Sequence, residues 1–198
     1  AFAMSNDPEL KGPAQARLDA LRARGLEAGE TAAWLHRGQA FAGPEILAWM
    51  AGADAACAAA GLSGAGDVRQ RMASLAPLIL RHPDVDEARL AGAYVACYSG
   101  GKAPFLTMTE VQRLTARVDT MLARGRLELI QLGTVVCFQQ GGEAWTLWNG
   151  IVRDRLIVAQ RPDGGWNLPH PAGEVVASAT ATLALETYYR YLPVCLLY

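Results

Sequence analysis

Three acidic residues lie close together in the segment Pro83-Asp84-Val85-Asp86-Glu87 and could do acid–base chemistry. Adjacent carboxyl groups that share one site repel each other when charged, which raises one pKa and keeps a proton available. At the start of a helix, the same residues would instead stabilise the N-terminus through the helix dipole. The nearby Arg89 would favour the ionised carboxylates. Both interpretations of Asp84, Asp86 and Glu87 stay open at this point.

The chain offers little for metal or nucleophilic catalysis. No Cys/His cluster has the spacing of a zinc site, and there is no GxGxxG, GxSxG, HExxH or Walker motif. One of the three histidines, His170, lies between two prolines and is expected to be a surface-loop residue. We therefore expect neither a metal nor a cofactor.

The composition indicates a globular protein with a large core. The 198 residues suit one domain, and 52% of them are apolar while 19% are charged. The net charge of −1 provides no electrostatic footprint for nucleic acid or for a membrane surface. No uncharged apolar run reaches the length of a membrane span, so we expect no transmembrane segment. The Ala-rich segment 46–62 is expected to form a buried helix instead.

A repeat of 40 residues runs through the chain. Three of the four cysteines mark it: Cys57, Cys97 and Cys137. Each lies in a run of small residues that ends at glycine, as a helix does when its last residue is left-handed. These runs are 52–61, 92–101 and 133–142. A fourth copy, 181–189, has Leu185 in the cysteine position, and Cys195 lies beyond it. We expect all four thiols to pack as small apolar groups without disulfides.

Longer amphipathic segments alternate with these runs. Their apolar residues recur at helical spacing in 13–24, 67–80, 109–124 and 143–160. Strand signals are weak, because no Asn-Gly or Asp-Gly turn separates alternating segments. The pattern predicts an all-α protein with four small inner helices shielded by four amphipathic outer ones. Such a set of repeats closes into a solenoid or a ring.

One short motif connects this pattern to a known family. Residues Gln160, Gly164 and Trp166 form Q-x3-G-x-W, which resembles the repeat motif of the terpene cyclases and the prenyltransferase/squalene-oxidase repeat proteins. Without the family, Gln160 could bond open carbonyls at its helix end, while Trp166 buries a large ring. Segments 48–62, 141–149 and 173–193 also resemble helices of bacterial cyclase-like proteins.

The resemblance implies an α/α toroid of alternating inner and outer helices. About four helix pairs make only part of a ring, whereas family rings have about five to seven. We therefore expect residues 1–198 to form a single partial toroid, the C-terminal portion of a longer chain. The rest of that chain, or a protein partner, would complete the ring.

The acidic segment lies just before the inner helix expected over 88–100. It resembles the D-x-D-D motif of squalene-hopene-type cyclases, which also lies at the head of an inner helix. By position, Asp86 would be the acid that protonates an alkene, with Asp84 and Glu87 beside it. The chain departs from the motif at Glu87 and at the following Ala88-Arg89, where the family has Thr-Ala. Aromatic residues on inner helices would line an apolar lumen and stabilise carbocations, or else fill the core. They are Trp49, Tyr94, Tyr98, Phe138 and Tyr188.

Two functions follow from these observations. The incomplete ring and the altered acid motif favour a non-catalytic repeat module for binding or assembly in a larger protein or complex. The alternative is the C-terminal part of a squalene-hopene-type cyclase that protonates a polyprenyl substrate. An apolar ligand is compatible with either function, and the resemblance favours an extracytoplasmic or envelope location.

Overall fold

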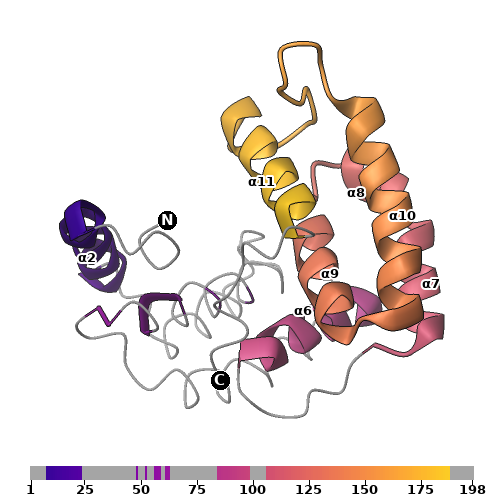
Figure 1. Cartoon of the computed structure of the whole chain (residues 1–198), viewed down its shortest axis with the longest axis horizontal. Coiled ribbons are helices and arrows are strands. Elements are labelled where there is room, and N and C mark those ends of the chain that lie inside the picture. Colours follow the sequence, from indigo (N-terminus) through magenta and orange to yellow (C-terminus); the bar gives the residue numbers. More distant parts are fainter. Residues whose placement is uncertain are drawn as a thin grey trace.

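The structure is a computed structural model, and it describes residues 8–23, 48, 52, 56–58, 61–62, 84–98 and 106–187 (Figure 1). Every regular element within these ranges is a helix, and an isolated antiparallel bridge joins Gln160 to Trp166. The predicted all-α class is therefore confirmed. None of the described helices combines the length and the apolar character that a membrane span needs.

The described helices overlap the segments that were predicted to be helical. Those described are α2 (Pro8–Ala23), α6 (Val85–Tyr98), α7 (Met108–Ala116), α8 (Val118–Ala123), α9 (Leu127–Gln140), α10 (Gly142–Ala159) and α11 (Glu174–Glu186). Helices α6, α9 and α11 cover the predicted inner segments from residue 92 onward. Helices α7, α8 and α10 cover the outer ones from residue 109 onward. The predicted helix over 67–80 and most of the one over 46–62 lie outside the described residues.

Helix α9 is the centre of the packed helices. It contacts α6, α8, α10 and α11, while α7 packs against both α6 and α10. Figure 1 shows α9 with α11 on one side and α10 on the other. Because neighbours surround it, the α9 residues from Leu127 to Cys137 are buried, apart from the half-buried Glu128. A helix that is apolar almost all round is expected to be buried on all sides, as α9 is.

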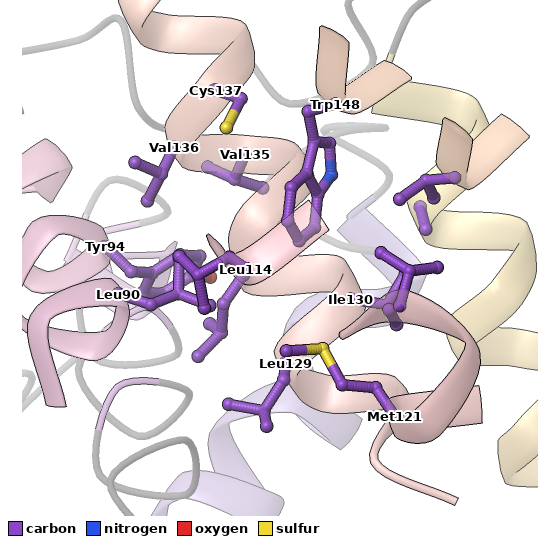
Figure 2. Close-up of a cluster of buried hydrophobic side chains, with 14 of the residues drawn as sticks. Leu90, Tyr94, Leu114, Met121, Leu129, Ile130, Val135, Val136, Cys137 and Trp148 are labelled. Atoms are coloured by element: carbon purple, nitrogen blue, oxygen red, sulfur yellow. The ribbon is translucent and has the colours of Figure 1, made fainter. Parts of the chain in front are cut away.

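A glycine lets α9 and α10 approach each other closely. A Cβ atom built on Gly133 of α9 would lie 2.1 Å from the Trp148 ring of α10. The fully buried Trp148 indole donates its Nε1–H to Thr134 Oγ1 at 3.0 Å, which satisfies its polar atom. Figure 2 shows this ring among Ile130, Val135 and the other buried side chains. The small residue in the repeat thus makes room for a tryptophan ring in the core.

Two predicted helix starts are corrected. The first helix was predicted over 13–24 from the helical spacing of its apolar residues. It begins at Pro8 instead, a residue type that suits a first helical turn, and Pro13 lies inside it. The second inner helix was predicted to start after the acidic segment, at Ala88. It starts at Val85, so that Asp86 and Glu87 belong to its first turn.

The predicted outer helix over 109–124 is divided at Arg117. Arg117 caps α7: its backbone N–H donates to the carbonyl oxygen of Leu114, three residues earlier, which tightens the last turn. Helix α8 begins at the next residue. The α7 start is fixed by Thr107 and Glu110, whose side chains each accept from the other's backbone N–H in a capping box. The break places Arg117 at a joint between two helices.

The repeat's glycines and cysteines behave as predicted where they are described. The backbone φ is +62° at Gly61 and +70° at Gly141, the left-handed conformation expected after a helix end. Cys57, Cys97 and Cys137 are not in disulfides. Burial, and then Cys97, raise the pKa of the Cys137 thiol to about 12, so Cys137 is a neutral packing group. Cys195 lies outside the described residues.

Candidate functional site

The three acidic residues form one cluster at the N-terminus of α6. Asp84 is the residue before the helix, and its Oδ1 accepts the backbone N–H of Glu87 at 3.1 Å. This is the contact of an N-cap residue, which satisfies one of the open donors of the first turn. Asp86 and Glu87 follow within that turn, where negative charge is favourable. Local sequence thus brings the predicted site residues together through helix capping.

Three arginines from other elements contact these carboxylates. Arg117 Nη2 lies 2.6 Å from Asp84 Oδ2 and 3.2 Å from Glu87 Oε1. Arg113 Nη2 lies 2.6 Å from Asp86 Oδ1. Arg126 Nη2 donates to the other carboxylate oxygen of Glu87, Oε2, at 3.0 Å. We call these six residues, Asp84, Asp86, Glu87, Arg113, Arg117 and Arg126, the acid–arginine joint.

The joint favours the charged form of Asp84. The hydrogen bond from Arg117 lowers the pKa of Asp84 to about 2, although partial burial acts to raise it. Glu87 is only 5% exposed, and a guanidinium contacts each of its two carboxylate oxygens. The same contacts raise the pKa of Arg117, with the Asp84 hydrogen bond as the main cause. Proton donation needs a neutral carboxyl group, whereas a guanidinium in contact stabilises the negative form.

The Q-x3-G-x-W segment forms a hairpin that joins α10 to α11. Trp166 is 3% exposed and donates its indole N–H to the Leu156 carbonyl at 2.7 Å. Its backbone N–H donates to Ser178 Oγ of α11 at 3.0 Å. Trp166 therefore satisfies an open carbonyl in the last turn of α10 and attaches that helix to the next one.

The predicted role of Gln160 is corrected. We expected its amide to bond open carbonyls at its helix end, but its Nε2 donates to Gly164 O within the turn, at 3.0 Å. Gly164 has φ +85°, which explains the glycine at this position. Gln160 thus closes the turn, while the indole of Trp166 bonds the Leu156 carbonyl of the helix.

The predicted lumen residues are only partly described. Tyr94 is 5% exposed and lies beside Leu90 in the core, as Figure 2 shows. The half-buried Phe138 packs edge-on against Trp145, with ring centroids 5.2 Å apart. Tyr98 ends α6, and its side chain is not described; Trp49 and Tyr188 also lie outside the described residues. Tyr94 is a core side chain here.

An open groove of about 600 Å³ lies between the α7–α8 pair and α10. Leu147 and Ile151 contribute apolar surface, and the exposed ion pair of Asp119 with Arg155 lies at its edge. Asp86 does not line this groove. Among the residues the structure describes, no group of three His, Cys, Asp or Glu side chains could hold a metal ion.

Two sets of contacts were not predicted from the sequence. Arg113 and Arg117 are four residues apart, so they share one helical face, a spacing that could have indicated a basic partner for the acidic cluster. The other set is the contact between His170 and Glu128. The Nε2 atom of His170 lies 2.7 Å from the Oε1 atom of Glu128. His170 was expected on the surface, yet its side chain is 5% exposed. A separation of 42 residues leaves no local signal for this pair.

Comparison of the chain with family models, with curated proteins and with solved structures finds no match.

Proposed function

We propose that this chain is a cyclase-like helical repeat module that serves binding or assembly in a larger protein or complex, without catalysis. The observation that carries this proposal is the acid–arginine joint. Asp86, the residue that would protonate a substrate, accepts hydrogen bonds from Arg113 Nε and Nη2. Its neighbours Asp84 and Glu87 are likewise engaged by guanidinium groups. The acidic cluster is therefore used to connect α6 to α7, α8 and α9.

The toroid arrangement is part of this proposal. It is supported by the packing of α9 between two other predicted inner helices, with α10 against it from the predicted outer set. The Trp166 contacts between α10 and α11 also support it, because the repeat motif of the family ties adjacent repeats together. A partial ring presents an open edge, so we propose that a protein partner or the remainder of a longer chain completes it.

The test separates assembly from catalysis. The chain is purified from its native source without denaturation, and the mass of the particle is measured by native mass spectrometry. The proposal predicts a stoichiometric particle heavier than the 21.1 kDa of these residues. The same preparation is then incubated with squalene and with a linear polyprenyl alcohol, and the products are analysed by gas chromatography.

The catalytic alternative makes a distinct prediction in this experiment. A cyclase would form cyclic products, and Asp86→Asn would abolish them while the fold remains intact. A Glu143→Gln variant is the matched control, because Glu143 also lies in a first helical turn but outside the joint. Cyclic product that disappears only in Asp86→Asn would overturn the assembly proposal.

A further inference from the structure

A single imidazole connects the turn before α11 to helix α9. His170 Nε2 lies 2.7 Å from Glu128 Oε1 of α9, and His170 Nδ1 accepts the backbone N–H of Ala172 at 3.1 Å. A backbone N–H can only donate, so Nδ1 must carry the lone pair. The ring proton is then on Nε2, which donates it to the Glu128 carboxylate. Both ring nitrogens of a nearly buried histidine are thus in use.

The same turn positions the start of α11. Gly173 donates its N–H to His170 O at 3.0 Å and precedes the helix, with a φ of +88°. The Gly173 carbonyl then accepts from Ala177 at 3.1 Å, the first backbone bond of α11. Pro169 lies close to Gly125: a Cβ atom added to Gly125 would be 2.1 Å from the carbonyl oxygen of Pro169. The His170 carbonyl and ring therefore both bond within the turn that leads into α11.

We propose that His170 is a proton-sensitive latch for the turn 170–173. When a proton from solvent binds Nδ1, the ring has two N–H donors and no acceptor, so the bond from Ala172 must break. The contact with Glu128 remains and becomes an ion pair. Acidification thus exchanges a bond inside the turn for a stronger bond between the turn and α9.

The charged groups on the elements around the ring identify its ionic partner. Among the described residues, Glu128 is the charged residue that is within hydrogen-bond distance of the His170 ring. On the adjoining elements, Arg126 follows Gly125 and contacts Glu87, while Glu174 at the α11 start pairs with Arg161. Arg124, on the other side of Gly125, is exposed. Protonation of the ring would therefore turn its contact with Glu128 into an ion pair.

The experiment follows the Ala172 amide by ¹H–¹⁵N NMR between about pH 8 and pH 5, the range in which histidine side chains ordinarily change charge. We expect its protection against hydrogen exchange, corrected for the intrinsic pH dependence, to fall about fivefold to tenfold, as for one lost hydrogen bond. The Gly165 amide, which donates to Asp163 Oδ1, is the internal control and should stay constant.

Two variants make the inference falsifiable. In His170→Asn, the amide oxygen replaces Nδ1 as an acceptor that cannot be protonated in this range, so the Ala172 change should disappear. In Glu128→Gln, the bond from the Ala172 amide to His170 Nδ1 is retained, so the Ala172 change should persist. An Ala172 amide that changes equally in His170→Asn and in the unmodified chain overturns the latch. So does an unchanged Ala172 amide while the His170 ring signals titrate.

Discussion

Gly133 is the residue on which the close contact between α9 and α10 depends. We expect Gly133→Ala to destabilise the fold by about 1–3 kcal/mol, because the added methyl overlaps the Trp148 ring and forces overpacking. Gly150→Ala in α10 is the matched control, since nothing lies within 4 Å of its Cβ position. It should be neutral or stabilising by up to about 1 kcal/mol through helix propensity. Urea denaturation measures both, and equal effects would contradict this packing.

The two ends of the Q-x3-G-x-W motif should contribute unequally. Trp166→Phe removes the N–H that satisfies Leu156 O in a buried site, which we expect to cost about 1–3 kcal/mol. Gln160→Ala removes one exposed hydrogen bond and should cost about 0.5 kcal/mol. Thermal denaturation of the two variants tests the order. A larger loss in Gln160→Ala would mean that the turn, and not the indole, holds the hairpin.

At the scale of helices, Arg117 should be the main connection between α6 and the α7–α8 break. Arg117→Ala removes contacts to Asp84 and to the buried Glu87, and we expect a loss of about 1–3 kcal/mol. Arg153→Ala is the control, because its exposed pair with the adjacent Asp154 should contribute less than about 0.5 kcal/mol. The free energy of unfolding in urea distinguishes the two. Similar losses would show that the joint stabilises no more than a surface ion pair.

The joint should also make this helix contact dependent on pH. Asp84 has a folded-state pKa of about 2, below its ordinary value of 3.8. Its stabilisation is therefore present above the unfolded-state value and is lost as the pH falls toward 2. We expect the difference in unfolding free energy between the unmodified chain and Arg117→Ala to shrink between pH 5 and pH 2. Measurements at three pH values in this range test the sign, and a difference that grows would contradict it.

For the whole molecule, the position of α9 predicts which part opens last. Its amides should exchange with solvent only through global unfolding, because four other helices pack around it. Helix α11 packs mainly on α9 and leaves Val175 82% exposed, so its amides should exchange through local opening. Hydrogen–deuterium exchange by mass spectrometry compares the two peptides. Equal exchange in α9 and α11 would mean that the helices open as one unit.

Local sequence was sufficient for the helical class and for the approximate positions of the described helices. Residues that are apolar at helical spacing bury one face, while a run such as Leu129–Cys137 can only lie inside. The glycine ends of helices were also predictable, because Gly141 adopts a conformation that costs other residues energy. The exact first residues of the helices were harder to predict from the sequence. Pro8 and Pro13 carry the same start signal, and only the formed backbone distinguishes between them.

The tertiary structure decided what the acidic cluster does and where His170 lies. The sequence by itself determined that Asp84, Asp86 and Glu87 would be neighbours, because residues this close in a chain share one helical turn. It left open whether they would share a proton or pair with cations. That depended on Arg113, Arg117 and Arg126, which are 27 to 39 residues away from their partners. Contacts at such separations come from how helices pack, and packing depends on all of their side chains together.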